Sequence, residues 1–298
     1  MINDYSLVFS ANSFLGAELI KVLKGENRRV IGTTRRMSEI SDERIYLDIS
    51  GDEPEFNIPK DLNHAYLLAG TWDYNECEKD PNAWKVNVVN MAKLAEDLLK
   101  KNIFVTFVST NTVFGGERPW CNENDNHDPQ FPYAFQKSAA EDALKNIAKT
   151  LHQDELLNIV RLTKILDIGV SPLPIWIDCI EKGEILRPFS DLSFAPMSAR
   201  YTAESLAKIG KARISGNFHI SGADNIGYVE FAKIFAERLG FSDVQVQPTT
   251  SIEMNVDIPF KPTYSAIGMD RTTKLIGLKP QKIDQLMDFL YQQYTSRT

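Results

Sequence analysis

A tyrosine and a lysine four residues apart are the side chains of this sequence best suited to acid–base chemistry. Tyr133 begins a helical pattern and Lys137 follows it, so the phenol and the ammonium group share one helix face. A phenol with a pKa of about 10 is a poor acid at neutral pH, and a cation held nearby lowers that pKa. Tyr133 could then exchange a proton with a substrate oxygen.

A hydroxyl group at the end of a predicted strand could complete this site. The apolar, β-branched run at residues 104–108 ends in Ser109 and Thr110, and Thr110 would hydrogen-bond the same substrate oxygen and fix its position. Tyr133 is the only one of the ten tyrosines with a lysine four residues further on. An exposed helix pair is the simpler interpretation of Tyr-x-x-x-Lys alone, and the preceding Ser-Thr favours the catalytic one.

The composition describes an ordinary globular chain of 298 residues, with 43% apolar and 24% charged residues. Its net charge of −7 argues against non-specific binding to nucleic acid or to an anionic membrane. The three cysteines, Cys77, Cys121 and Cys179, indicate free thiols in a reducing compartment. No basic segment leads into a long apolar run, so we expect a cytoplasmic protein. The four histidines lack metal-ligand spacing, and no metal site is predicted.

Strand and helix patterns alternate through most of the chain. Strands are predicted from short apolar runs at residues 5–9, 29–32, 45–47, 65–70, 103–108, 156–162 and 217–220. Helices are predicted from apolar spacing at residues 15–25, 81–101, from 133 onward, 231–239 and 283–290. This alternation predicts an α/β fold with a doubly wound parallel sheet. In such sheets ligands bind at the carboxyl ends of the strands.

The loop after the first strand has the spacing of a dinucleotide-binding loop. Ser10, Ser13 and Gly16 occupy the three positions of Gly-x-x-Gly-x-x-Gly, where glycines let backbone amides approach a pyrophosphate at the helix N-terminus. A polar turn capped by Ser or Asn remains an alternative. If the loop does bind a dinucleotide, Asn12, Phe14 and Leu15 would contact it too. The Cβ atoms of the two serines should then make binding loose.

The following strand ends suggest which dinucleotide binds. Arg35 and Arg36 follow the second strand, where arginine accommodates a 2′-phosphate, so NADPH is predicted over NADH. The alternative is a pair of solvated arginines. Asp48 and Ile49, after the third strand, are predicted to contact the adenine. The fourth strand ends in Leu68, Ala69 and Gly70, whose small residues would let the nicotinamide ribose approach the backbone; these residues are predicted to contact it.

The order of these parts resembles the extended short-chain dehydrogenase/reductase superfamily, and within it the dTDP-4-dehydrorhamnose reductases. The resemblance runs nearly end to end. It rests on the degenerate glycine loop, Asp48-Ile49, Asn87, the Ser-Thr-x-x-Val-Phe-Gly at residues 109–115, Tyr133 and Lys137, and also on Glu76, Pro81, Ser138, Glu141, Arg161 and residues 261–262 and 274–280.

The resemblance implies two domains and a set of site residues. Residues 1–165, with a returning strand near 203–221, would form an NAD(P)-binding Rossmann domain. Residues 166–298 would form a smaller α+β domain that binds a nucleotide-diphosphate sugar, and the chain could form a homodimer. The implied catalytic residues are Thr110, Tyr133 and Lys137. Asn87, Tyr133 and Lys137 would also contact the cofactor. The predicted substrate contacts are Thr110, Asn111, Thr112, Lys164 and Arg200.

Departures from the family pattern help to choose between chemistries. Asn111-Thr112 stands where the reductases usually have Asp-Tyr, and Lys164 where an aromatic residue is common. A 4,6-dehydratase needs an acidic pair after Thr110, and an epimerase-reductase needs a nearby cysteine; neither is found there. The sequence therefore predicts an NADPH-dependent reductase of a 4-keto nucleotide sugar. Two alternatives stay open: an epimerase with bound NAD, and a non-catalytic, dinucleotide-binding regulatory subunit.

Overall fold

A single parallel sheet forms the larger part of the molecule. The computed structural model describes residues 4–52, 54 and 56–297. Within these ranges seven strands pair in the order β10-β6-β5-β4-β1-β2-β3. Their bounds are β1 Tyr5–Val8, β2 Arg29–Thr34, β3 Arg44–Tyr46, β4 His64–Leu67, β5 Phe104–Thr110, β6 Leu157–Leu162 and β10 Gly216–Ile220. All neighbours run parallel, which confirms the doubly wound sheet predicted from the sequence.

The central strands were predictable because they are buried on both faces. Every residue of β1, β4 and β6 is buried, and such strands are continuous apolar runs in the sequence. Two strands extend beyond their predicted carboxyl ends. β2 extends through Thr34, because Thr33 and Thr34 pair with β3. β5 includes Ser109 and Thr110, because these two residues pair with Arg161 and Leu162 of β6.

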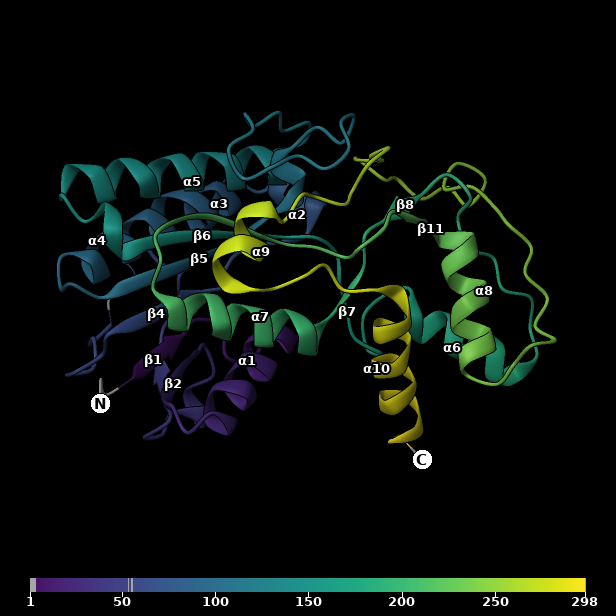
Figure 1. Cartoon of the computed structure of the whole chain (residues 1–298), viewed down its shortest axis with the longest axis horizontal. Coiled ribbons are helices and arrows are strands. Elements are labelled where there is room, and N and C mark those ends of the chain that lie inside the picture. Colours follow the sequence, from purple (N-terminus) through teal and green to yellow (C-terminus); the bar gives the residue numbers. More distant parts are fainter. Residues whose placement is uncertain (1–3, 53, 55, 298) are drawn as a thin grey trace.

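Helices cover both faces of the sheet (Figure 1). The helices of the chain are α1 Phe14–Gly25, α2 Tyr74–Lys79, α3 Pro81–Trp84, α4 Met91–Leu99, α5 Pro132–Thr150, α6 Leu173–Lys182, α7 Ala199–Ala212, α8 Tyr228–Arg238, α9 Asp270–Ile276 and α10 Ile283–Thr295. Helices α4 and α5 enclose one core against the sheet, and α1 and α7 enclose the other. Within the described ranges, none of the helices has the length and apolar character needed to cross a membrane.

The helix predicted at residues 81–101 is interrupted. A π-helical segment, η2 (Lys85–Asn90), separates α3 from α4, and Asn87 lies within it. Single π-turns of this kind occur often at functional sites. Short 3₁₀ segments, η1 (Met37–Glu39), η3 (Asn111–Val113) and η4 (Asp154–Leu156), follow or precede strands.

A third core lies beyond the carboxyl edge of the sheet. It joins α6, α8 and α10, on the right of Figure 1. Two small sheets accompany it, β11 (Ile226–Gly227) with β8 (Ser193–Phe194), and β7 (Ile165–Leu166) with β9 (Met197–Ser198). We propose that this core belongs to the substrate-binding domain, with a boundary near residue 165. Three later segments return to the Rossmann sheet, since α7 packs on α1, β10 pairs with β6 and α9 packs on β10.

Candidate active site

Most of the predicted site residues come together at the carboxyl edge of the sheet. Thr110 ends β5, and the segments with Ser10, Arg35, Asp48, Leu68 and Lys164 follow β1, β2, β3, β4 and β6. Tyr133 and Lys137 lie in the first two turns of α5. Parallel strands bring their carboxyl ends to one edge, so the fold itself gathers residues that are far apart in the sequence.

Lys137 is held by strand β5. Its Nζ donates a hydrogen bond of 2.7 Å to the main-chain oxygen of Val108 and lies 4.2 Å from the ring centroid of Phe107. Because the side chain is buried, desolvation lowers the pKa of Lys137 to about 8. The cation is therefore fixed beside the end of β5, and the desolvation of its ammonium group opposes folding.

The phenol of Tyr133 behaves differently from the prediction. Desolvation raises the pKa of Tyr133 above its usual value, and the nearby Tyr74 and Cys77 raise it further. The expectation that Lys137 lowers this pKa is wrong for the chain on its own, because the hydrogen bond of Lys137 goes to Val108 and desolvation outweighs the attraction between the charges. Tyr133 is consequently a protonated phenol throughout the neutral range.

Aromatic side chains that the sequence did not single out surround Tyr133. The ring of Tyr74, in α2, lies 5.6 Å from that of Tyr133 and 4.8 Å from that of Phe131, between centroids. Phe260, from the segment after α8, stacks on Phe131 at 5.0 Å. These contacts fix the orientation of the Tyr133 ring. No periodicity links the four residues, so only the folded chain shows the cluster.

Thr110 sits where β5 turns into η3. Its hydroxyl oxygen accepts a hydrogen bond of 3.2 Å from the amide of Thr112, and the two hydroxyls lie 3.1 Å apart. Asn111 turns towards the C-terminal part of the chain, where its Nδ2 donates to the main-chain oxygen of Ser265 at 2.9 Å. Thr110 and Thr112 thus stay together, whereas the amide of Asn111 connects the end of β5 to the segment before α9.

The loop after β1 has the geometry of a dinucleotide-binding turn. Ser10 adopts a left-handed backbone, with φ of 57°, a conformation that glycine adopts without strain. Ser13 caps α1 by accepting a hydrogen bond from the amide of Gly16. A Cβ at Gly16 would lie 2.3 Å from the oxygen of Ser10, so the turn is as tight as the family pattern requires.

These residues fit a pyrophosphate at the helix N-terminus. In the part of the chain that the structure describes, the amides of Phe14 and Leu15 have no hydrogen-bond partner. First-turn amides of a helix attract anions. Asn12 and Ser13 flank them, and the positive end of the α1 dipole adds to the attraction. Phe14 and Leu15 stay predicted contacts of the diphosphate, and the hydroxyl of Ser13 is engaged by the amide of Gly16 and the main-chain oxygen of Ser10.

The two arginines after β2 have different environments. Arg36 forms an ion pair of 2.8 Å with Glu39, which also accepts hydrogen bonds from Asn12 and Thr34. Arg35 is exposed. The pKa of Asp48 is lowered mainly by hydrogen bonds from Ser50, and the charge of Arg35 lowers it further. Glu39 was not among the residues predicted from the sequence. Its position three residues after Arg36 was the available signal.

The remaining cofactor candidates line the same edge. Asp48 accepts hydrogen bonds from the amide and hydroxyl of Ser50, and Ile49 packs against the first core. Asn87 accepts from the amide of Thr71 and donates to its carbonyl oxygen, both at 2.8 Å. A Cβ at Gly70 would lie 2.8 Å from Oδ1 of Asn87. Asn87 therefore shapes the loop formed by Leu68, Ala69 and Gly70.

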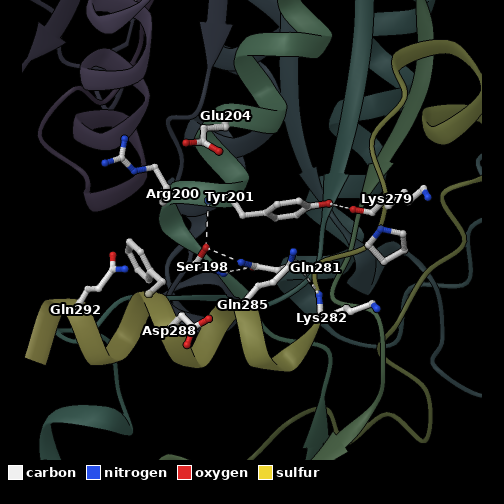
Figure 2. A pocket seen from close by; sticks show the side chains of 12 residues that line it. Ser198, Arg200, Tyr201, Glu204, Lys279, Gln281, Lys282, Gln285, Asp288 and Gln292 are labelled. Atoms are coloured by element: carbon white, nitrogen blue, oxygen red, sulfur yellow. Dashed lines mark hydrogen bonds between the residues drawn. The ribbon is translucent and has the colours of Figure 1, made fainter. Parts of the chain in front are cut away.

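Arg200 and Lys164 occupy separate places. Arg200 lies in α7 and forms an ion pair of 2.9 Å with Glu18 of α1. It lines a pocket of about 440 Å³ between α7 and α10 together with Tyr201 and Gln281 (Figure 2), and Thr110, Tyr133 and Lys137 are not among the residues that line this pocket. Lys164 lies between β6 and β7, and desolvation lowers its pKa.

A buried charged network lies behind the site. Arg161 of β6 pairs with Glu141 of α5 at 2.8 Å, and both side chains are almost fully buried. Arg161 also contacts His127 at 2.8 Å and His219 at 3.2 Å. His219 donates through Nδ1 to the oxygen of Gly268, as expected for a satisfied core histidine. The network connects α5, β6, β10 and the segment before α9.

The comparisons with known proteins support a relation over the whole chain. The family model described as RmlD substrate binding domain matches residues 6–295. The Bacillus subtilis spore coat polysaccharide biosynthesis protein SpsK is 25% identical over 280 residues, or 92% of each chain. The probable low-salt glycan biosynthesis reductase Agl14 of Haloferax volcanii is 23% identical over 98% of this chain and 100% of its own.

A solved structure gives the same picture for the fold. The dTDP-4-dehydrorhamnose reductase of Bacillus anthracis, in complex with NADP, superposes with a TM-score of 0.79 at 19% identity, over 99% of this chain and 100% of that chain. The long coverage extends the likeness beyond the Rossmann sheet to the third core and α10.

Proposed function

The chain belongs to the RmlD substrate-binding domain family of extended short-chain dehydrogenases/reductases, and from this premise we propose that it reduces a 4-keto nucleotide sugar with NADPH. As a family member it is an NAD(P)-dependent oxidoreductase acting on nucleotide sugars. The observation that carries the proposal is that one edge of the sheet holds a hydroxyl, a phenol and a fixed cation: Thr110 ends β5, Tyr133 lies in the first turn of α5, and Nζ of Lys137 is bound to the main-chain oxygen of Val108. The phenol is protonated at neutral pH, so it has a proton to give to a carbonyl oxygen that gains negative charge.

The residues divide the work as follows. Thr110 donates a hydrogen bond to the substrate carbonyl oxygen and holds it in place. Tyr133 donates its proton to the same oxygen as negative charge develops there. Lys137, fixed on β5, stabilises the phenolate that remains until solvent reprotonates it. NADPH, when bound, supplies the hydride.

The cofactor would lie along the carboxyl edge. The amides of Phe14 and Leu15 would hold the diphosphate, and Arg35 would meet a 2′-phosphate because its exposed guanidinium carries no ion pair among the described residues. Lys137 and Tyr133 would contact the nicotinamide ribose. NADH would bind the same site with fewer charged contacts.

The sugar nucleotide would enter between the sheet edge and the third core. Thr112 and Lys164 follow β5 and β6 at this edge, Tyr74 provides aromatic surface beside Tyr133, and Phe260 stacks on Phe131. Arg200 is assigned to the substrate diphosphate only if its pair with Glu18 opens on binding.

Two alternatives make different predictions about bound cofactor. An epimerase keeps its NAD⁺ through every cycle, whereas a reductase releases oxidised cofactor each time. The left-handed Ser10 and the capping Ser13 favour loose binding, and hence reduction. We expect the purified protein to carry no nicotinamide. Tightly held NAD⁺ would favour the epimerase, and no dinucleotide binding at millimolar concentration would favour a regulatory subunit.

The deciding experiment is a screen of nucleotide-diphosphate 4-keto sugars for oxidation of NADPH and NADH. We expect loss of reduced-nicotinamide absorbance with at least one dTDP- or UDP-linked 4-keto sugar. Tyr133→Phe serves as the matched blank for each substrate. A wild type that equals the blank on every sugar, while binding dinucleotide, would contradict the reductase assignment.

We further propose that the chain forms a homodimer through the apolar surface of α3 and α5 and works in the cytoplasm. Trp84 and Phe135 are about half exposed beside a groove of about 380 Å³ between α3 and α5. A second copy of the chain would cover this apolar surface in a homodimer, which light scattering of the purified protein would detect. The free thiols of Cys77, Cys121 and Cys179 suit a reducing, cytoplasmic setting.

A further inference from the structure

The residues around Glu39 form a charged cluster at the rim of the dinucleotide loop. The carboxylate accepts hydrogen bonds from Asn12 Nδ2 at 2.6 Å, from Arg36 Nη1 at 2.8 Å and from Thr34 Oγ1 at 3.1 Å. Arg44 lies 4.0 Å from the same carboxylate and donates to Asn12 Oδ1 at 2.6 Å. One acidic side chain thus joins the loop after β1 to the end of β2.

These two segments are the ones between which the adenosine ribose lies in a doubly wound dinucleotide site. Asn12 belongs to the first and Thr34 to the second, and Glu39 bonds to both. Its carboxylate therefore occupies the place that faces the ribose 2′ position. The hydrogen bonds from Asn12 and Arg36 lower the pKa of Glu39 to about 2, so the group is charged at every pH at which the protein would work.

A carboxylate and a pair of arginines beside the ribose 2′ position favour different dinucleotides. Arginine favours a 2′-phosphate, whereas a carboxylate repels it and accepts a hydrogen bond from a 2′-hydroxyl. Arg36 is already paired with Glu39, and a 2′-phosphate would have to compete for it. Arg35 alone remains to meet the phosphate without breaking a pair.

We propose that Glu39 sets the choice between NADPH and NADH, by holding Arg36 and by presenting its carboxylate to the ribose 2′ position. The inference rests on the proposed function and refines its cofactor. The wild-type chain binds both dinucleotides, with a preference for NADPH below about tenfold, since one free arginine is offset by one carboxylate. Removing the negative charge frees Arg36 and makes the chain selective for NADPH.

The test compares dissociation constants of the purified full chain for NADPH and NADH, by calorimetry or tryptophan quenching, without sugar. In Glu39→Gln we expect the Kd for NADPH to fall about tenfold and the Kd for NADH to change by less than about threefold. The gain should shrink at high salt, because the charges are only partly buried. Glu43→Gln is the matched control. Glu43 is exposed and pairs with Lys24, and its substitution changes the net charge by the same amount as Glu39→Gln.

A second variant tests the mechanism within the cluster. In the Glu39→Gln background, Arg36→Ala should cancel most of the gain in NADPH affinity, because that gain comes from the freed guanidinium. An unchanged ratio of the two Kd values in a folded Glu39→Gln protein overturns the inference and leaves the reductase proposal standing. A wild type that binds neither dinucleotide overturns the reductase proposal itself.

Discussion

The Nζ of Lys137 and the main-chain oxygen of Val108 are joined by a hydrogen bond of 2.7 Å. This bond fixes the cation of the candidate site to the strand that also carries Thr110. The ammonium group is consequently positioned by β5 main chain, independently of Tyr133. Several properties of the protein should depend on this arrangement.

Tyr133→Phe should reduce kcat by roughly 10²–10⁴-fold, because only the phenolic proton donor is lost. The ring packing against Tyr74 and Phe131 is retained, so the melting temperature and the dinucleotide Kd should stay close to wild type. Stopped-assay turnover, calorimetry and thermal melts measure the three quantities. Tyr291→Phe, at an exposed position of α10, is the control. Activity within a few-fold of wild type would sink the catalytic assignment.

The reduction should weaken as pH rises through about 8. The pKa of Lys137 is lowered to about 8 by desolvation, so its cation is present below this pH and lost above it. Because kcat/KM reports groups of the free enzyme, a plot of log kcat/KM between about pH 6 and 9.5 should bend downward near 8. Lys137→Arg, if active, should remove the bend, since guanidinium stays charged. A level profile to the alkaline end would refute this role of the cation.

Lys137→Met should stabilise the fold at neutral pH while it abolishes turnover. The folded-state pKa lies below the usual 10.5, so the folded chain binds fewer protons than the unfolded chain between about pH 8 and 10.5. Stability therefore rises with pH across this window, and the full cost of the buried charge is present below it. Removing the buried charge should raise the free energy of unfolding by about 1–2 kcal/mol at pH 7, once the lost hydrogen bond to Val108 is subtracted.

Urea unfolding measures this gain in stability. Lys149→Met, at an exposed position of the same helix, removes the same charge and should leave the free energy of unfolding within about 0.5 kcal/mol of wild type. A loss of stability in Lys137→Met would mean that the hydrogen bond to Val108 outweighs the desolvation of the ammonium group.

Ser10→Gly should tighten dinucleotide binding and add about 0.5–1 kcal/mol of stability, because glycine adopts a φ of 57° without a Cβ clash. Ser13→Gly should instead cost a few tenths of a kcal/mol through the lost cap to Gly16. Asn27→Gly is the matched control, since Asn27 has a φ of 58° in the turn after α1. Asn27→Gly should leave the dinucleotide Kd unchanged. If it lowered the Kd as much as Ser10→Gly does, the geometry of the loop after β1 would not be what limits binding.

Glu141→Gln should destabilise the fold by about 3–5 kcal/mol, since it leaves Arg161 buried with its charge unpaired. Burial alone would raise the pKa of Glu141, but hydrogen bonds from His127 and Arg161 hold it below the usual 4.5. Its stabilisation is thus present above about pH 4.5 and lost as pH falls further. Urea midpoints at pH 7 and in acid test this, with exposed Asp142→Asn as control. A loss of stability in Glu141→Gln that is equally large at pH 7 and in acid would contradict this prediction.

Sequence patterns predicted the sheet and the edge at which the site forms, for a physical reason. Strands buried on both faces appear as apolar runs, and polar residues that follow several such runs must meet at one edge. The partners of individual charges were not predictable. Lys137 could reach several acceptors from its helix face, and only the packing of α5 on β5 selects Val108. Glu39 meets Asn12 because η1 turns the chain back, which no periodicity encodes.

The late position of β10 in the chain has a consequence for how the protein is made. The edge of β6 remains open until the ribosome has synthesised β10, and the core under α7 remains incomplete until α7 emerges. At roughly 5–20 residues per second, strands β1–β6 wait for seconds with β6 as an unpaired, mostly apolar edge strand, a hazard for aggregation. A nascent chain stalled after β6 should therefore bind chaperones, whereas one stalled beyond α9 should already resist protease.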